Sequence, residues 1–293
     1  MTVLTLDNLS KYFGKVKAAD NVSIDINEGE IFGFIGPNGA GKSTTIRMII
    51  GALNETSGDI YFKGQNIKQH RNYIEEVSYV PGDVNLWDNL TGMEVINFFM
   101  KLRGFKDKKL RDDLIEKFRL DPGKKCKTYS KGNRQKVALI SAFLSEADLL
   151  IFDEPTTGLD PLMERVFHEE ILNAKKQGKS VLLSSHILSE VEKLADRIAI
   201  IREGEIIETG KLSDLSHITR IEYILSSDND LSALQDKEYV HDFRKEEENI
   251  HLMVDNDKVS TFLEDISGYK ITYLVTEPPK LEDIFMRYYE DKS

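Results

Sequence analysis

The chain has 293 residues, 40% hydrophobic and 30% charged, which is enough for two domains of ordinary globular composition. Its net charge of −11 is concentrated in residues 210–293, where 10 Lys and Arg residues stand against 19 Asp and Glu residues. This acidic end argues against a nucleic-acid partner and against direct adhesion to an anionic lipid surface, because both need clustered Lys and Arg. The single cysteine, Cys126, excludes an intramolecular disulfide and fits a reducing compartment.

The sequence offers no targeting or membrane-spanning signal. The N-terminal residues lack a basic segment followed by an apolar one, so we expect no signal peptide. No apolar run approaches the roughly 20 residues that a membrane helix needs. We therefore expect a cytoplasmic protein with no direct membrane insertion, which reaches a membrane only through a partner.

The first 80 residues alternate strand-like segments with turns. A helix is predicted from Lys42 to Ile50, closed by Gly51. β-branched and aromatic residues bounded by Gly and Asn predict strands at "VLTL" (3–6), "VSIDI" (22–26), "IFGFIG" (31–36), "GDIYFKGQNI" (58–67) and "VSYV" (77–80).

From Thr91 the hydrophobic period becomes helical. Thr91 and Glu94 form a capping-box pattern before "MEVINFFMKL", and further helices are predicted over 107–119 and from about Ser130. This block, at about residues 84–145, is a helical subdomain inserted between strands.

Strands and helices alternate again after the helical block, which predicts a parallel sheet covered on both faces. The strands are "LLIFD" (149–153), "VLLSS" (181–185), "RIAII" (197–201) and "EIIET" (205–209), and the helices cover 161–177 and 187–195. The pattern restarts after Gly210, with a last predicted helix at "KLEDIFMRYY" (280–289). We place one domain at 1–215 and a small acidic α/β domain at 216–293.

The segment "GPNGAGKS" matches the pattern of Gly, four residues and Gly-Lys-Ser, between a predicted strand and a predicted helix. The backbone amides of such a loop and of the helix N-terminus bind phosphates. In this arrangement the Lys42 side chain would reach the β- and γ-phosphates, and the Ser43 hydroxyl would ligate Mg²⁺. The alternative, a plain glycine-rich turn, is disfavoured by the strand and helix context. The predicted nucleotide contacts are Gly36, Pro37, Asn38, Gly39, Ala40, Gly41, Lys42, Ser43 and Thr44.

Two adjacent carboxylates end the apolar strand of "LLIFDEP". Asp153 would hold Mg²⁺ through water, and Glu154 would act beside the γ-phosphate as the general base for a water molecule. Adjacent residues on a strand point in opposite directions, so the two carboxylates can have different roles. Without a phosphate-binding loop, solvated acids at a strand end would be the simpler interpretation.

The segments "GPNGAGKST", "LLIFDEPTTGLDP" and "VLLSSHILSEVEKLADRI", in this order and spacing, resemble the ATP-binding subunits of ABC transporters. The resemblance covers about the first 215 residues. It implies an α/β P-loop NTPase fold of the ABC type, with a mixed sheet core, an inserted helical subdomain, and ATP and Mg²⁺ as cofactors. It also implies an ATPase that dimerises around two ATP molecules, with itself or a homologous subunit, and drives an integral membrane permease subunit.

The resemblance assigns further site residues. Phe13 would stack on adenine, with Tyr12 as the alternative; His186 would contact the γ-phosphate, and Asp160 would lie at the subunit interface and link the two sites. A half-buried aromatic at a strand end and a structural histidine are the simpler interpretations of Phe13 and His186.

The stretch "YSKGNRQK" (129–136) departs from the Leu-Ser-Gly-Gly-Gln signature of the family. Ser130 and Gly132 keep the positions of its γ-phosphate contacts, and Ser130 is also a suitable helix N-cap. Lys131 replaces a glycine and adds positive charge at an anion site. A basic surface patch is the alternative, but we interpret the stretch as a working signature directed at the ATP of the facing subunit.

The loop after the strand at 77–80 is a second departure, because Gly82 stands where the family has a glutamine. Glycine offers no metal ligand, and Asp83 is the candidate substitute. Without the glutamine, the sequence assigns no residue that would transmit the nucleotide state to the helical subdomain.

The divergent signature, the missing glutamine and the ending "EPPKLEDIFMRYYE" resemble bacterial exporters of antibiotics, lipids or peptides, in which the ATPase and the membrane subunit are separate chains. Among these, the chain resembles staphylococcal-type exporters of amphipathic peptide toxins, the phenol-soluble modulins. This resemblance implies a peripheral location on the inner face of the cell membrane, through the permease.

Two other classes of function remain as alternatives. A related ATPase acting on DNA would need a long coiled coil before the signature, and one acting on ribosomes would need two cassettes in tandem; the chain has neither pattern. A regulator that binds ATP without hydrolysing it is disfavoured by the presence of Glu154 and His186. Phosphate release by the purified protein separates this regulator from an ATPase.

Overall fold

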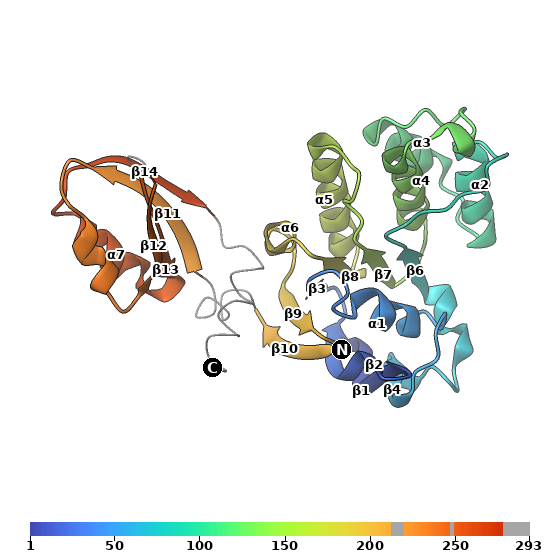
Figure 1. The fold of residues 1–293 in the computed structure, drawn as a ribbon. Helices are drawn as coiled ribbons and strands as arrows, with labels where there is room; N and C mark the ends of the chain where they lie inside the picture. The colour runs from blue at the N-terminus through green and yellow to red at the C-terminus, as the bar shows by residue number, and fades with distance from the viewer. Residues whose placement is uncertain (212–219, 247–248, 278–293) are drawn as a thin grey trace. The chain divides into compact units, whose positions relative to one another are not determined.

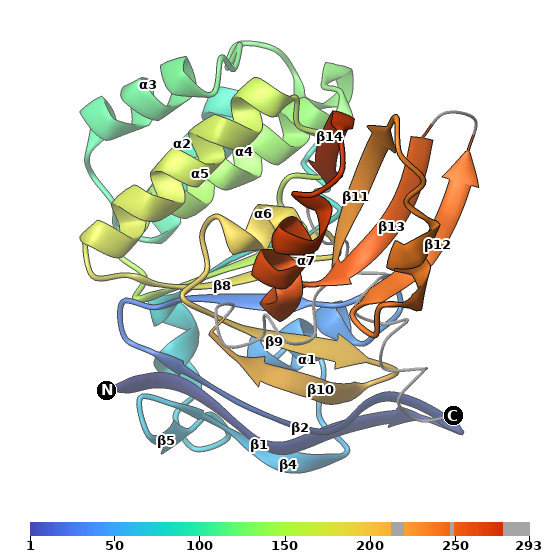
Figure 2. The same ribbon diagram turned by 90° about the vertical axis from the view of Figure 1, so that its left-hand side faces the viewer.

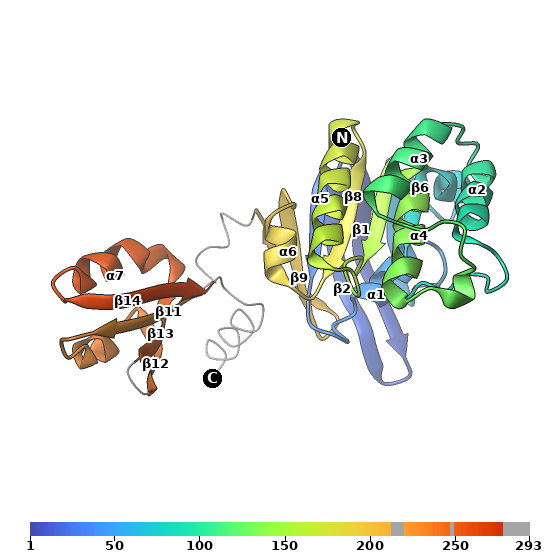
Figure 3. The same ribbon diagram turned by 90° about the horizontal axis from the view of Figure 1, so that it is seen from above.

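The structure is a computed structural model that describes residues 1–211, 220–246 and 249–277. The chain divides into two compact units, whose elements Figures 1, 2 and 3 show from three sides. The N-terminal unit comprises residues 1–186 and 193–209, and the C-terminal unit comprises residues 187–192 and 210–293. The helix predicted at 280–289 lies outside the described residues.

An antiparallel sheet forms one layer of the N-terminal unit, with the strand order β2-β1-β4-β5. In β2 the apolar residues Val22, Ile24 and Ile26 are buried and the polar residues between them are exposed, as expected of a sheet with one solvated face. The strands are β1 (Thr2–Phe13), β2 (Val16–Asn27), β4 (Ser57–Phe62) and β5 (Gln65–Asn66).

A six-stranded sheet forms the second layer, in the order β10-β9-β3-β8-β7-β6. The pairs of β3 with β8 and β9, and of β7 with β6 and β8, are parallel. Every residue of β3, β7 and β8 is buried, as expected of parallel strands covered on both faces. The strands are β3 (Ile31–Ile35), β6 (Val77–Val80), β7 (Leu149–Asp153), β8 (Ser180–Ser185), β9 (Arg197–Arg202) and β10 (Glu205–Gly210).

Helices cover both faces of this sheet, which confirms the predicted fold class. Ile151 of β7 belongs to the same core as Ile46 of α1 (Lys42–Ile49). The next residue, Phe152, points the other way, and its ring lies 5.2 Å from that of Phe167 in α5 (Pro161–Lys176). The two helices therefore pack on opposite faces.

The helical subdomain contains α2 (Gly92–Leu102), α3 (Lys108–Lys117) and α4 (Lys131–Phe143), together with the 3-10 helix η2 (Cys126–Thr128); the 3-10 helix η1 (Arg71–Glu76) precedes β6. Thr91 and Glu94 form both hydrogen bonds of the predicted capping box. In the part of the chain that the structure describes, no helix is long and apolar enough to cross a membrane.

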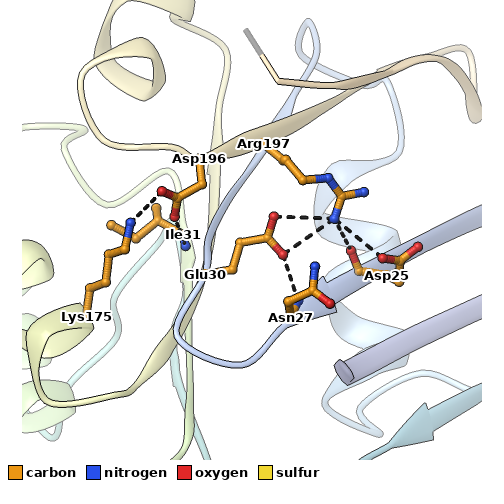
Figure 4. Close-up of polar contacts among 7 residues, drawn as sticks. All are labelled: Asp25, Asn27, Glu30, Ile31, Lys175, Asp196 and Arg197. Atoms are coloured by element: carbon orange, nitrogen blue, oxygen red, sulfur yellow. Dashed lines mark hydrogen bonds and ion pairs between the residues drawn. The ribbon is translucent and has the colours of Figure 1, made fainter. Parts of the chain in front are cut away.

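A polar network fixes the start of β3, at the strand end opposite the glycine-rich loop that follows β3 (Figure 4). The Arg197 guanidinium lies 3.3 Å from Glu30 Oε1, and the Ile31 amide donates a 2.8 Å hydrogen bond to Asp196 Oδ2. Lys175 of α5 also pairs with Asp196. These contacts connect β3, α5 and the start of β9, and so stabilise the strand β3 from which the loop before α1 begins.

The C-terminal unit contains an antiparallel sheet in the order β12-β13-β11-β14. Its core includes Tyr223, Leu225, Leu252 and Phe262. The elements are α6 (Leu188–Glu192), β11 (Arg220–Ser227), η4 (Ser232–Asp236), β12 (Val240–Glu246), β13 (Asn249–Asp255), η5 (Asn256–Lys258), α7 (Val259–Ile266) and β14 (Ile271–Glu277). The sequence patterns do not predict β12, and α6 is shorter than the helix predicted over 187–195.

Candidate nucleotide-binding site

The loop between β3 and α1 has backbone positions that only glycine fits. A Cβ atom at Gly36 would lie 2.3 Å from the Ile201 carbonyl oxygen, and one at Gly41 would lie 2.3 Å from that of Ala18. Gly41 also has a φ of +110°, which L side chains rarely adopt. The loop can therefore lie against two neighbouring strands and leave its own amides at the start of α1.

Lys42 is a buried cation at the base of this loop, with 4% of its side chain exposed. Its Nζ donates hydrogen bonds to the carbonyl oxygens of Gly36 (2.6 Å) and Pro37 (3.2 Å) and lies 3.2 Å from Glu154 Oε1. Because a buried ammonium group is costly without partners, these contacts hold its charge at the site. A cavity of about 140 Å³ adjoins it, lined by Asn38, Gly39, Gly41, Lys42, Ser43, Thr44 and Glu154.

At the end of β7, the side chains of Asp153 and Glu154 have different surroundings. Asp153 is buried, and its Oδ1 accepts a 2.6 Å hydrogen bond from Ser184 Oγ. Glu154 has a left-handed φ of 50°, and its amide lies 3.2 Å from both the carbonyl and the hydroxyl oxygen of Ser184. Sequence reasoning missed Ser184; a small polar residue at the end of a buried strand beside this acidic pair was the available signal.

Glu154 lies between two residues that are distant in sequence. Its Oε2 is 3.2 Å from His186 Nδ1, and its Oε1 is the atom that faces Lys42. Since β3, β8 and β7 are parallel neighbours, their carboxyl ends deliver Lys42, His186 and Glu154 to the same edge of the sheet. The structure thus brings three of the predicted residues together at the cavity.

The residues present fit a magnesium ion bound together with phosphates. Ser43 lines the cavity with its hydroxyl, and Asp153, the residue before the lining residue Glu154, is the candidate carboxylate ligand. In the described ranges, no three His, Cys, Asp or Glu side chains are grouped as a complete metal site. Mg²⁺ usually takes only one or two protein ligands and completes its shell with phosphate and water, so this sparse donor set suits it.

The signature stretch lies outside this cavity. Ser130 is exposed, and its Oγ caps α4 by accepting a 3.3 Å hydrogen bond from the Asn133 amide. A Cβ atom at Gly132 would lie 2.3 Å from the Gly158 carbonyl oxygen, so α4 begins against the turn that precedes α5. This contact within one chain is a second reason for glycine at position 132, and sequence reasoning did not reveal it.

Tyr129 anchors the start of the signature. Its hydroxyl donates a 2.6 Å hydrogen bond to the Asp121 carbonyl oxygen, and burial raises the pKa of Tyr129 to about 12. A Cβ atom at Gly92 would lie 2.4 Å from the same hydroxyl, so α2 approaches it closely. These contacts of Tyr129 therefore hold the backbone position of the next residue, Ser130, at the start of α4.

Three further predicted positions also lie away from the cavity lining. Asp160 caps α5, its Oδ1 accepting from the amides of Leu162 (3.1 Å) and Met163 (3.0 Å). Phe13 is 51% exposed, with Lys11 Nζ 5.2 Å from its ring centroid. Tyr12, the alternative to Phe13, is engaged by a 2.6 Å hydrogen bond from its hydroxyl to Asp20 Oδ1.

Gly82 lies directly against the acidic pair. A Cβ atom there would be 3.0 Å from the Asp153 carbonyl oxygen and 3.7 Å from Glu154 Cβ. The position is therefore next to the catalytic candidates, as its place in the family pattern implies, although glycine brings no functional group. Asp83, the next residue, is exposed.

Comparisons with known proteins show the family of the chain. The sequence model of the ABC transporter family matches residues 19–157. The chain is 33% identical to the ABC transporter ATP-binding protein YhaQ of Bacillus subtilis, over 97% of both chains. It is 32% identical to the bacitracin transport ATP-binding protein BcrA of Bacillus licheniformis, over 98% of this chain and 97% of BcrA.

A solved structure of the ATP-binding subunit of an ABC transporter matches 73% of this chain and 91% of its own, with 32% identity and a TM-score of 0.68. Lys42 and Glu154 line one cavity, and His186 Nδ1 lies 3.2 Å from Glu154 Oε2. The chain belongs to the ATP-binding subunits of ABC transporters, and it is an ATPase of that family.

Proposed function

We propose that the chain hydrolyses ATP as one half of a dimer and thereby drives export through a separate membrane subunit. The observation that carries this proposal is the position of Glu154, 3.2 Å from both Lys42 and His186 at the cavity of the phosphate-binding loop. A carboxylate that lies between a cation and an imidazole beside a phosphate site can act on an attacking water molecule.

Different residues of the site would bind the phosphates, hold Mg²⁺ and act on the attacking water molecule. The loop amides from Gly36 to Thr44 and the Lys42 ammonium hold the β- and γ-phosphates, and Ser43 and Asp153 hold Mg²⁺, which would offset phosphate charge. Phosphate competes with Glu154 for Lys42, so nucleotide binding releases one carboxylate oxygen. Glu154 then accepts a proton from the water molecule, while His186 orients the carboxylate and contacts the γ-phosphate.

The second half of each ATP site comes from a facing subunit. Ser130 is exposed, and neither it nor Gly132 lines the cavity of its own chain. The start of α4 is thus free to approach the nucleotide of a second subunit, with the amides of its first turn and its dipole directed at phosphate. Asp160, which caps the neighbouring helix α5, would lie at the same interface.

Phe13 completes the nucleotide site through its exposed ring, on which adenine would stack. The ring already has a cation beside it, since Lys11 Nζ lies 5.2 Å from its centroid. Tyr12 is a poorer candidate because its hydroxyl is held by Asp20.

The transported substrate belongs to the antibiotics, lipids and amphipathic peptides. Similarity to BcrA over nearly its whole length, a protein named for bacitracin transport, supports an antibiotic or peptide cargo. The phenol-soluble modulins are the specific candidates within this class. The chain would work on the cytoplasmic face of the membrane, held there by the permease.

The regulator that binds ATP without turnover is the competing function; phosphate release by the purified protein separates the two, and Glu154→Gln tests the role of Glu154. An amide cannot accept the proton from water, so phosphate release should fall at least about 10²-fold while ATP still binds and a dimer accumulates. Glu203→Gln is a matched control, because Glu203 has the same left-handed φ (51°) in an exposed turn. Near wild-type phosphate release by the Glu154 variant would remove this residue from its role.

A further inference from the structure

Asp20 carries a buried carboxylate to which the proposed function gives no role. The residue lies near the start of β2 and is 5% exposed. Its Oδ2 accepts a 2.5 Å hydrogen bond from Lys17 Nζ, and its Oδ1 accepts a 2.6 Å hydrogen bond from the Tyr12 hydroxyl. These hydrogen bonds, from Lys17 and Tyr12, lower the pKa of Asp20, so the carboxylate is ionised at neutral pH. The bonded charge therefore ties the Tyr12 side chain to β2.

Tyr12 directly precedes Phe13, the last residue of β1. Successive residues of a strand point to opposite faces, so the bond of the Tyr12 hydroxyl leaves the half-exposed Phe13 ring on the other face. The register between β1 and β2 shifts between Lys11 and Tyr12, so the ladder is irregular here. The side-chain bond to Asp20 therefore adds a constraint at the end of β1 where the backbone pairing is weakest.

The backbone of Asp20 connects the same strand to the phosphate-binding loop. Its amide donates a 2.7 Å hydrogen bond to the Gly204 carbonyl oxygen, in the turn between β9 and β10. The Gly204 amide in turn donates a 3.0 Å hydrogen bond to the carbonyl oxygen of Ala40 in the loop. A Cβ atom at Gly204 would lie 3.0 Å from the Lys17 carbonyl oxygen, so this turn fits closely against β2. Asp20 is thus bonded to the end of β1 by its side chain and, through Gly204, to the loop by its backbone.

We propose that Asp20 is a positioning residue that sets the place of the Phe13 ring relative to the phosphate-binding loop, and thereby the affinity for ATP. The inference rests on the proposed function, in which adenine stacks on Phe13 while the loop holds the phosphates. One nucleotide spans both contacts, so its affinity depends on the geometry between them. Replacing the Asp20 side chain keeps the backbone amide, so it loosens the Phe13 end and leaves the bond towards the loop in place.

Asp20→Ala tests this inference by calorimetric titration of the full chain with ATP. The dissociation constant of ATP should rise at least about threefold, which is part of the value of stacking a base on an aromatic ring. Turnover at saturating ATP should stay unchanged, because the carboxylate contacts neither the loop nor Glu154. Tyr12→Phe should also raise the dissociation constant, since it keeps the ring and removes only the hydroxyl. This second variant tests the same bond with the buried carboxylate still in place.

Asp59→Ala is the matched control in the same antiparallel sheet. The Asp59 carboxylate also accepts hydrogen bonds from a neutral side chain, Asn66 (2.8 Å), and from a lysine, Lys68 (3.1 Å), which lower its pKa. Asp59 belongs to β4 and does not line the cavity. This control should bind ATP like the wild type, and thermal melting should show that all three variants are folded.

A double-mutant cycle with Phe13→Ala distinguishes positioning of the ring from a general loss of structure. Phe13→Ala alone should raise the dissociation constant of ATP at least about fivefold. If Asp20 acts through the ring, Asp20→Ala should add less than about twofold in the Phe13→Ala background. The full effect of Asp20→Ala in that background, or wild-type affinity of the single Asp20 variant, would overturn the inference.

The same measurements separate this inference from the proposed function. Unchanged ATP affinity of the Phe13 variant would remove the stacking role from the proposed function, and the inference with it. Absence of phosphate release by the wild type would overturn hydrolysis alone, because the titrations measure binding and do not depend on turnover.

Discussion

Glu154 occupies a backbone conformation that a residue with a side chain adopts at a cost. A left-handed φ outside glycine costs on the order of 1–3 kcal/mol and persists where the surroundings hold it. Here Ser184 supplies that constraint through its carbonyl and hydroxyl oxygens. The turn sends the Glu154 carboxylate to Lys42 and His186, while Asp153 stays in the buried strand. The constraint thus separates two adjacent carboxylates into two sites.

Lys42→Ala should reduce ATP hydrolysis about 10²-fold or more, because it deletes one preorganised charge at a phosphate. Steady-state phosphate release is the measurement. Lys179→Ala is the control for losing a partly buried lysine. Burial lowers the pKa of Lys179, and its ammonium donates a hydrogen bond to the Ser145 carbonyl oxygen, outside the cavity lining. Full activity with unchanged nucleotide affinity in the Lys42 variant would contradict the proposed site.

Element boundaries were predictable where a single side chain sets them. Thr91 with Glu94, and Ser130, begin α2 and α4 as their cap patterns predicted, since capping depends on residues within one turn. The strand β12 was not predictable from its charged sequence, because its place comes from pairing with β13. The approach of α4 to the Gly158 turn joins residues 26 positions apart, and no local pattern encodes it.

Gly132→Ala tests that approach. The added methyl group would lie 2.3 Å from the Gly158 carbonyl oxygen, so α4 or the turn must move, and the free energy of unfolding should fall by about 1–3 kcal/mol. In Gly123→Ala, the control in the same subdomain, the nearest neighbouring atom is an Asp121 carboxylate oxygen at 3.6 Å, and the change should be small. Urea denaturation measures both. Equal stabilities of the two variants would mean that Gly132 is not required for packing.

At the scale of the whole molecule, the residues lining the cavity all precede residue 155, within the N-terminal unit. Deleting residues 217–293 should therefore leave ATP binding intact, as measured by calorimetry. A truncated protein that is folded, by circular dichroism, yet does not bind ATP would show that the division into two independent domains is wrong.

The proposed sharing of each ATP site between two subunits makes a prediction about mixtures of inactive variants. Ser130→Arg inserts bulk and removes the cap at the start of α4, and Lys42→Ala empties the phosphate-binding loop of its cation. Each variant alone should be nearly inactive, because both of its sites contain the defect. A heterodimer of the two has one intact site, in which the loop of the Ser130 variant faces the signature of the Lys42 variant.

Mixing the two variants with different tags should therefore restore ATP-dependent pairing between tags, with partial hydrolysis if one site can turn over. Pull-down of one tag with and without ATP measures the pairing, and phosphate release measures the turnover. Each variant mixed with itself is the control and should show neither. If no ratio of the two restores pairing, then the signature acts as a basic patch or the natural partner is a different ATPase chain. Repeating the mixture with that chain separates these cases, since only a shared site regains ATP-dependent pairing.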